Sequence, residues 1–412
     1  MKIKPGTFLF LHEFMKYYFF LIVFTASTFS SYNVTAQSYK KIHKKAILVD
    51  THNDILTQCF EKNVSFDEDL TGKTQSDLTR FAKGGVDVQV FSVWCDGKKE
   101  NPYNYAKSQI DTLYATVQRN PKKITIVTNS KELKRAVKEK KLAAMIGVEG
   151  GHMIEDDINK LDTFYNMGVR YLTLTWNNSN PWATSAMEET RDSLLHQPKG
   201  LNDYGKKIIH RMNQLGMMVD LSHVGEKTFW DVIGTTNKPV LVSHSCAYTL
   251  CPVFRNLKDD QIKAVRKNAG VIDINFYSAF LDSNYAKRQK DLILEHKGER
   301  DSLLKLNPDK DLAFEILLNK YKDEFYAISP PLSIIIDHID YIAKLIGVDY
   351  VGLGSDFDGV SNCTPQQLED VTSYPLITKA LLEKGYSKKD IYKILGGNFL
   401  RVLKANEEKV SL

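Results

Sequence analysis

Residues 143–152 read Ala-Ala-Met-Ile-Gly-Val-Glu-Gly-Gly-His, a run of apolar and small residues that ends in an acid, two glycines and a histidine. A short apolar run predicts a buried strand, and the acid at its end needs a partner because an unpaired interior carboxylate is costly. Similar runs recur along the whole chain, and most end in a residue that can bind a metal ion or transfer a proton. The strands that we predict cover residues 46–49, 86–93, 143–148, 171–175, 217–221, 240–243, 271–275 and 350–354.

Helical patterns separate these runs, for example over residues 158–167 and 201–215, and each of these two is followed by a glycine, as expected beyond a helix end. This alternation predicts βα units and a parallel sheet. Eight strands with intervening helices predict an α/β fold of the (β/α)₈ TIM-barrel type, whose active site lies at the C-terminal strand ends. A doubly wound sheet is the weaker alternative, because no Gly-x-Gly-x-x-Gly loop follows the first strand.

Two segments depart from this rhythm. Residues 281–326 are rich in Lys, Glu and Asp with helical periodicity, which predicts a charged helical insertion between strands 7 and 8. Such an insertion could cover the barrel mouth, but a solvated excursion without a catalytic role is the favoured interpretation. Residues 391–405 predict a closing amphipathic helix that is interrupted at Gly396-Gly397.

The composition is that of a globular protein: 412 residues, 43% hydrophobic, 25% charged, with a formal charge of +5. Such a mild charge argues against a nucleic-acid partner. Residues 1–36 resemble a secretory signal, with early lysines, an apolar run over 17–24 and a cleavage site after Ala36. The run is shorter than the roughly 20 residues that a membrane span needs, although an uncleaved anchor is the alternative. We therefore predict an exported protein, periplasmic or extracellular, whose residues 37–412 form a single barrel domain.

The five cysteines leave disulfide bonding open. An odd number excludes a fully paired framework within one chain, and a domain of this size does not need disulfides. Cys246 and Cys251 are close enough in sequence to pair.

Five strand-end residues have the chemistry of metal ligands. His52 and Asp54 follow the first run, and alternate residues of a strand face the same side, so together they offer an ion two ligands. Glu149 would be stabilised as a carboxylate bridging two ions, the alternative being a salt bridge or a cap. His223 and His244 end consecutive runs, and neighbouring strands would bring both imidazoles to one ion.

Two charged residues are candidates for other roles. Asp356 follows the eighth run, where it could take a proton from a metal-bound water and give it to a leaving amine. A capping or salt-bridged loop acid is the alternative. Arg255 is a candidate clamp for a substrate carboxylate, which a guanidinium binds bidentately. Asp358 has no comparable argument and is predicted to be structural.

Together these residues resemble the membrane (renal) dipeptidase family of zinc peptidases, a branch of the amidohydrolase barrels. The likeness covers nearly the whole chain after residue 36, in one order. The matching stretches are Val-Asp-Thr-His-Asn-Asp at 49–54, Gly-Val-Glu-Gly-Gly-His at 147–152, Tyr-Leu-Thr-Leu-Thr at 171–175, Asn-Pro-Trp-Ala at 180–183, Val-Asp-Leu-Ser-His-Val at 219–224, Ser-His-Ser-Cys-Ala-Tyr at 243–248, Arg-Asn at 255–256, Gly-Ser-Asp-Phe-Asp-Gly-Val at 354–360 and Gly-Gly-Asn-Phe-Leu-Arg-Val at 396–402.

The resemblance implies two zinc ions per chain. Their implied ligands are the strand-end residues already named: His52, Asp54 and Glu149 for one ion, and Glu149, His223 and His244 for the other. It also implies that Arg255 holds the C-terminal carboxylate of a dipeptide and that Asp356 shuttles the proton. Members of the family often form homodimers, which makes a homodimer the expected assembly.

One position departs from the family pattern. The family usually has a histidine after Tyr-Leu-Thr-Leu-Thr, whereas this chain has Trp176. An indole donates one hydrogen bond but carries no positive charge, so substrate preference and efficiency should differ more than the reaction class. We assign Trp176, together with Tyr277 at the end of the seventh run, to substrate contact.

The sequence thus predicts an exported binuclear zinc dipeptidase that hydrolyses small dipeptides through a hydroxide bridging the two metals. One alternative is a barrel amidohydrolase acting on another amide or a lactam. Another is a metal-free binding relative disabled at Trp176, against which the intact set of five ligands argues.

Overall fold

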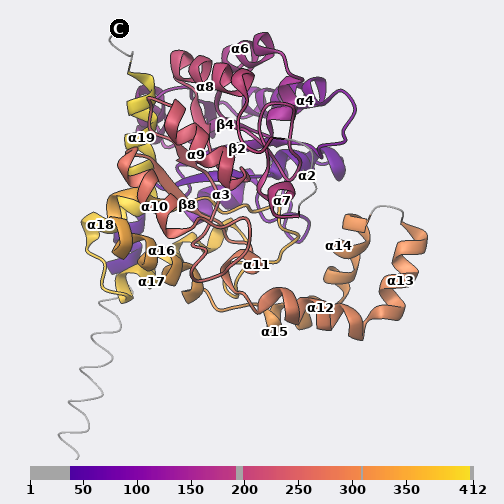
Figure 1. Cartoon of the computed structure of the whole chain (residues 1–412). Coiled ribbons are helices and arrows are strands. Elements are labelled where there is room, and N and C mark those ends of the chain that lie inside the picture. Colours follow the sequence, from indigo (N-terminus) through magenta and orange to yellow (C-terminus); the bar gives the residue numbers. More distant parts are fainter. Residues whose placement is uncertain (1–37, 192–197, 308–309, 409–412) are drawn as a thin grey trace, which may run out of the picture.

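The computed structural model describes residues 38–191, 198–307 and 310–408, and its centre is a parallel sheet that curls into a barrel (Figure 1). Eight strands follow one another around it in chain order, and every neighbouring pair is parallel. They are β1 (Val49–Asn53), β2 (Val88–Trp94), β4 (Leu142–Glu149), β5 (Val169–Thr173), β6 (Met218–Asp220), β7 (Leu241–Val242), β8 (Val271–Ile274) and β9 (Val351–Leu353). The predicted (β/α)₈ barrel is confirmed, with each strand within a few residues of its expected place.

Polar side chains close the seam between the first and last strands. Beyond β9, Ser355 donates to Asp50 from its backbone nitrogen at 2.8 Å and from its hydroxyl at 2.7 Å. The hydroxyl of Thr51 lies 3.2 Å from the carbonyl oxygen of Leu353 in β9 and 2.7 Å from that of Ser243 beyond β7. An isolated parallel bridge joins Asn53 to Phe357 just past the strand ends. These bonds hold the end of β1 against the segment that follows β9.

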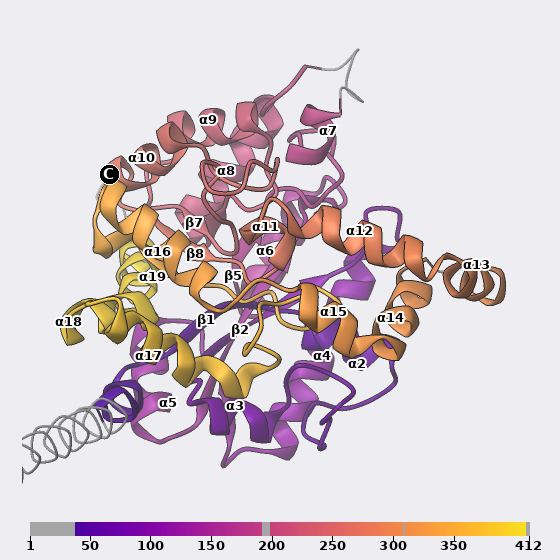
Figure 2. The ribbon, with the colours of Figure 1, turned by 90° about the horizontal axis from the view of Figure 1, so that it is seen from below.

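Helices surround the strands (Figures 1 and 2). Before β9, the helices around the barrel are α2 (Ile55–Glu61), α3 (Leu78–Gly84), α4 (Pro102–Arg119), α5 (Ser130–Lys138), α6 (Ile158–Asn166), α7 (Ala186–Thr190), α8 (Asp203–Leu215), α9 (Glu226–Thr235), α10 (Asp259–Lys267) and α16 (Ser333–Ile346). Those that follow β9 are α17 (Tyr374–Glu383), α18 (Lys388–Tyr392) and α19 (Asn398–Glu407). Short helical turns cover Gly151–Ile154, Val348–Tyr350, Val371–Ser373 and Lys393–Gly397.

The strands separate an inner core from an outer one. In β4, Ala143 and Met145 pack inside the barrel, whereas Ile146 and Val148 pack outward against helices, as strand alternation requires. Glu149 has the same parity as Met145 and therefore points into the barrel at its C-terminal end. The inner core also includes Phe399 of α19, so the last helix covers the end at which the strands begin.

The predicted charged insertion between the seventh and eighth barrel strands is present. It consists of α11 (Ser278–Leu281), α12 (Tyr285–Glu295), α13 (Lys297–Leu306), α14 (Lys310–Lys320) and α15 (Lys322–Ile328). We call α12, α13 and α14 the helical arm. The arm extends beyond the outline of the barrel in both views (Figures 1 and 2). It returns toward the barrel at an ion pair of 2.6 Å between Lys62, just after α2, and Glu315.

Other features refine the expectations. A ninth strand that the sequence did not predict, β3 (Ile124–Ile126), pairs with the outer edge of β4 off the barrel path. The tail is helical and is interrupted near Gly396, as predicted. No helix within the described ranges is both long and apolar enough to span a bilayer. The predicted signal, residues 1–36, lies outside the described residues.

Candidate metal centre

Three imidazoles surround the carboxylate of Glu149 at the C-terminal end of the barrel. His223 Nε2 lies 2.8 Å and His244 Nε2 lies 3.4 Å from Glu149 Oε1. His52 Nε2 lies 3.3 Å from the other oxygen, Oε2. The two oxygens of one carboxylate thus face different histidines, which is the arrangement of a bridging ligand between two ions.

Two aspartates complete this cluster on the side of His52. Its Nε2 lies 3.5 Å from Asp54 Oδ2 and 4.0 Å from Asp356 Oδ1. Ligand atoms of these three residues all lie within 4.8 Å of one another, as do those of His52, Glu149 and His244. The other oxygen of Asp54 is buried and has no hydrogen-bond partner among the described residues. The cluster therefore contains two overlapping sets of potential ligands.

Hydrogen bonds behind the histidines fix which ring nitrogen carries the proton. The hydroxyl of Ser243 donates to Asp220 Oδ2 at 2.7 Å and lies 2.7 Å from His244 Nδ1. Because its single proton goes to Asp220, Ser243 must accept from His244 Nδ1–H. Nε2 of His244 is then left with a free lone pair directed at the cluster.

The other two histidines follow the same logic. Tyr171 donates its hydroxyl proton to the Thr51 carbonyl at 3.2 Å, so it accepts from His52 Nδ1 at 2.9 Å. His223 Nδ1 lies 3.2 Å from Asn177 Oδ1, which only accepts. Metal-binding histidines characteristically donate their second ring N–H to such partners. All three Nε2 atoms are therefore available as ligands.

The charge in the cluster favours a bound cation. Burial lowers the pKa of His223 to about 4, and it lowers the pKa of His244 well below its ordinary value. Burial also lowers the pKa of His52, but Tyr171, Glu149 and Asp54 outweigh it, so the net shift is well upward. The cluster thus attracts positive charge: without a metal ion its carboxylates favour a proton on His52, and a bound cation would take the place of that proton. Imidazole and carboxylate ligands in this arrangement fit zinc.

Asp356 is held at the edge of the cluster in a state suited to proton transfer. Burial raises its pKa to about 8, helped by Asp54 and Glu149 and opposed by His52. Asn275 donates to Asp356 Oδ2 at 2.8 Å, which leaves Oδ1 facing the cluster. The backbone of Asp356 has φ = 63°, a left-handed conformation that is uncommon outside glycine. His223 has a similar φ of 64°, so two residues of the cluster have this local geometry.

Arg255 is a buried cation without an anion. It is 4% exposed, and its guanidinium donates to Ser245 Oγ at 3.2 Å and to the His244 carbonyl at 3.1 Å. Its Nε has no partner, and no carboxylate lies within ion-pair distance anywhere in the part of the chain that the structure describes. Burial lowers the pKa of Arg255. A buried, unpaired guanidinium beside the cluster suits an incoming carboxylate.

Aromatic residues also border the site. Trp176 lies in the loop after β5, with its ring 6.4 Å from that of His223 and 5.0 Å from Trp94 in an edge-to-face contact. Tyr277 packs edge-to-face against Phe280 at 4.8 Å. Burial raises the pKa of Tyr277, and the charges of Cys363 and Asp356 add to the rise. Trp176 thus neighbours the His223 side of the cluster, and Tyr277 the Asp356 side.

The residues that orient the histidines were not predicted from the sequence. Tyr171, Asn177 and Ser243 lie on or beside strands, where a polar residue has no distinguishing signal. In the structure the Tyr171 ring lies over Gly147 of the neighbouring strand β4, where a Cβ would lie 2.0 Å from it. All five cysteines are free and buried, so the structure contains no Cys246–Cys251 bond.

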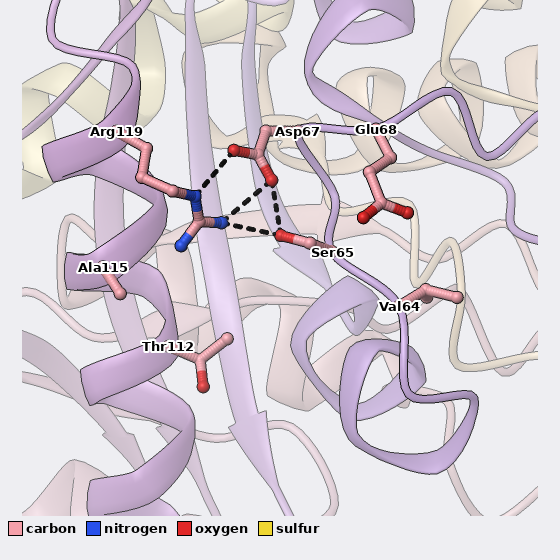
Figure 3. Close-up of a pocket in the computed structure, with 7 residues that line it drawn as sticks. All are labelled: Val64, Ser65, Asp67, Glu68, Thr112, Ala115 and Arg119. Carbon is pink, nitrogen blue, oxygen red and sulfur yellow. Dashed lines mark hydrogen bonds and ion pairs between the residues drawn. The ribbon is translucent and has the colours of Figure 1, made fainter.

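An open hollow elsewhere on the surface contains none of these residues. It has a volume of about 600 Å³ and is lined by Val64, Ser65, Asp67, Glu68, Thr112, Ala115 and Arg119 (Figure 3). Arg119 donates to both oxygens of Asp67, at 2.9 and 3.0 Å, and to Ser65 at 2.8 Å. Its charge is therefore already neutralised, unlike that of Arg255.

Comparison with known proteins identifies relatives over most of the chain. The sequence model of membrane dipeptidase (peptidase family M19) matches residues 36–411. An uncharacterized dipeptidase, C965.12, of Schizosaccharomyces pombe is 35% identical over 395 residues, covering 90% of this chain and 83% of the relative. Dipeptidase 3 of Mus musculus is 31% identical over 368 residues, and the match covers 88% of this chain but only 64% of the mouse protein.

Solved structures share the fold. The probable dipeptidase PvdM of Pseudomonas aeruginosa superposes with a TM-score of 0.74 at 24% identity, covering 92% of this chain and all of that one. A metallopeptidase of Rhodobacter sphaeroides, solved with a phosphinate mimic of the dipeptide L-Ala-D-Ala, gives a TM-score of 0.69 at 21% identity, covering 88% and 100%.

Proposed function

The chain belongs to the membrane dipeptidase family, peptidase family M19, and from that premise we propose that it is an exported binuclear zinc dipeptidase acting on small dipeptides. A metallopeptidase that hydrolyses peptide bonds is what the family establishes. The zinc, the number of ions, the roles of individual residues and the export are the proposal.

One observation carries the proposal: three imidazoles, each anchored at Nδ1, direct their Nε2 atoms at both oxygens of one buried carboxylate. We assign the ligands accordingly: His52, Asp54 and Glu149 to one zinc ion, and Glu149, His223 and His244 to the other. Two zinc ions held by these residues would polarise the scissile carbonyl and lower the pKa of the attacking water toward neutrality.

Asp356 is the proposed general base and acid. Its Oδ1 lies near His52, while Asn275 holds the other oxygen, so one oxygen is free to receive the proton of the attacking water. The same carboxyl group then gives this proton to the departing amine. Burial raises the pKa of this carboxyl, which favours its uptake of the proton.

Arg255 is the proposed binding group for the C-terminal carboxylate of the dipeptide. Its unpaired Nε and deep burial support this role, because a substrate carboxylate would supply the missing counter-ion. The proposal also limits substrate length, since the carboxylate must sit beside the cluster. The phosphinate dipeptide mimic bound by the Rhodobacter sphaeroides relative supports small dipeptides as the substrate class.

Trp176 and Tyr277 are the proposed substrate contacts on the two sides of the cluster. The indole of Trp176 lies 6.4 Å from the ring of His223, so we expect it to contact a substrate side chain on that side of the cluster.

Export rests on residues 1–36, which have the pattern of a secretory signal ahead of a single barrel domain over 37–412. The homodimer stays a prediction, which light scattering of the purified protein tests.

The decisive experiment combines metal analysis with a substrate panel. We expect about two zinc equivalents per chain, hydrolysis of dipeptides, and loss of activity with a strong chelator that added zinc restores. Dipeptide amides, which lack the carboxylate, should be poor substrates. Full activity in excess chelator would exclude the metal mechanism, and hydrolysis of lactams but not dipeptides would favour the other amidohydrolase class.

A pair of arginine variants tests the substrate assignment. Arg255→Gln should raise the KM for dipeptides and reduce the difference in KM between dipeptides and their amides. Arg119→Gln, in the hollow of Figure 3, removes an arginine that is already paired, so the KM for dipeptides and the difference from the amides should not change. Equal behaviour of the two variants would contradict the role of Arg255.

A further inference from the structure

The three histidines of the centre are anchored differently behind their rings. The chain from His52 passes through Tyr171 and ends on the Thr51 carbonyl, a neutral group. His223 is held by the neutral side-chain amide of Asn177. Only the chain behind His244 ends on a carboxylate, that of Asp220, reached through the Ser243 hydroxyl.

Asp220 is surrounded by hydrogen-bond donors. It is fully buried on β6, and each of its oxygens accepts two hydrogen bonds. Oδ1 accepts from the backbone nitrogens of Ser222 at 3.2 Å and Ser243 at 2.8 Å. Oδ2 accepts from the hydroxyls of Thr173 at 2.6 Å and Ser243 at 2.7 Å. Four hydrogen bonds to its two oxygens compensate the burial of this side chain and fix its position.

We propose that Asp220 is a positioning residue that acts through Ser243 to keep the proton of His244 on Nδ1, and thereby sets the affinity of the ion that His244 binds. The inference rests on the proposed metal set and goes beyond it. The negative end of the chain also polarises the Nδ1–H bond of His244, which strengthens its Nε2 as a ligand.

The direction of the hydrogen bonds from His244 through Ser243 to Asp220 can be reversed by one substitution, which provides a test. Asp220→Asn replaces Oδ2 by an NH₂ group, which donates to Ser243 instead of accepting from it. The Ser243 proton must then turn to another acceptor, and His244 Nδ1 at 2.7 Å is closer than Ser222 Oγ at 3.2 Å. His244 would consequently carry its own proton on Nε2, the metal-facing nitrogen, and lose its ligand lone pair.

Ser243→Ala interrupts the chain without reversing it. Nδ1 then loses its partner, but nothing forces the proton onto Nε2. The double variant should therefore behave like Ser243→Ala alone, because the reversed asparagine has no hydroxyl to act through. A purely structural role for Asp220 predicts the opposite, namely that the second change adds its own cost to the first.

The experiment measures zinc affinity on metal-free protein by competition with a chromophoric chelator, together with the Tm of each metal-free variant. We expect Asp220→Asn to weaken one of the two zinc ions by about 10–100-fold, and Ser243→Ala to weaken it less. Adding Ser243→Ala to Asp220→Asn should restore affinity to the level of the single alanine variant. Tyr171→Phe, at the neutral chain of His52, is the matched control and should spare that ion.

The outcomes separate this inference from the proposed function. Wild-type protein that binds no zinc would overturn the function itself. Wild-type protein that binds two ions while Asp220→Asn binds both equally well would overturn only the role of Asp220. Losses of zinc affinity that add up in the double variant would also overturn it. So would a fall in zinc affinity that simply follows the fall in Tm across all the variants. If Asp220→Asn fails to fold, a normal zinc affinity in Ser243→Ala contradicts the inference by itself.

Discussion

The barrel rim and the helical arm differ in the side chains that they bury and expose. The rim buries ionisable side chains, with His52 at 0% and Glu149 at 4% exposure. The arm exposes leucines, of which Leu306 is 78% and Leu294 is 49% exposed. Scattered exposed apolar residues are ordinary in soluble proteins, whereas buried charges need specific partners. Replacements at the rim should therefore have large effects and replacements on the arm small ones.

The largest effect is expected at Glu149, which faces all three imidazoles. Glu149→Gln removes the charge that both proposed ions share, so we expect weaker binding of both. Turnover should fall by more than about 10³-fold, beyond the 10²–10³ typical of one lost electrostatic group. Zinc analysis and dipeptide hydrolysis measure this, with Glu132→Gln at the surface of α5 as the control. A Glu149→Gln variant that retains two ions and normal turnover would show that the rim is no more sensitive to replacement than the arm.

Asp356→Asn should separate catalysis from metal binding. The amide keeps the shape of the side chain but cannot take up the proton, so turnover should fall by about 10²-fold or more. Zinc content should be unchanged, because the proposed ligand set does not include Asp356. Loss of zinc, or near-normal turnover, would show that the residue has another role.

Trp176→His tests the edge of the rim. If the indole contacts a substrate side chain, the change should weaken binding of that substrate by about 1–3 kcal/mol. If the indole only fills the wall, the new donor should raise turnover on ordinary L,L-dipeptides. Values of kcat and KM across a dipeptide panel distinguish the two, with Trp230→His on α9 as the control. Unchanged values on every substrate would place Trp176 outside the site.

The metal-free protein should lose stability as the pH rises. The pKa of Asp356 is about 8 when folded, against about 4 when unfolded, so the folded state retains a proton that the unfolded state releases. Between these values this group should lower the free energy of unfolding by up to about 1.4 kcal/mol per pH unit. His223 and His244, whose pKa values burial lowers, act in the opposite sense below about pH 6.5, so the fall is expected between about pH 6.5 and 8. Urea unfolding at several pH values measures the slope. Asp356→Asn should flatten it, and an unaltered slope would assign it to other groups.

The smallest effect is expected on the arm. Leu306→Ser removes a side chain that is 78% exposed, so the free energy of unfolding should change by less than about 0.5 kcal/mol. Dipeptide hydrolysis and zinc content should not change. A clear loss of activity would mean that the arm contributes to the site, which would remove the distinction between the two regions.

The sequence predicted the barrel and the candidate cluster because both depend on local pattern. Apolar runs mark strands, and in a parallel barrel all strand ends meet at one rim, so His52, Glu149 and His244 could be brought together without knowing any distance. The short edge strand β3 was missed because three residues that pair on one side have too little pattern.

The hydrogen bonds behind the ligands could not be predicted in the same way. Asp220 and Ser243 come together only because β6 and β7 are neighbours in register, and Tyr171 reaches His52 only across the barrel interior. Nor does the sequence reveal that His223 and Asp356 have left-handed backbones, since His and Asp, although enriched in that conformation, adopt it at only a minority of positions.

The seam of the barrel determines when the centre can exist. Asp50 and Ser355, which clasp it, are 305 positions apart, and Asp356 follows directly. While the ribosome is still extending the chain, only a partial cluster is available, and the seam that holds His52 in place is still open. Full-affinity loading must therefore wait until the chain has been extended beyond Asp356. The metal supply that matters is then that of the compartment in which the barrel closes, rather than the one in which translation begins.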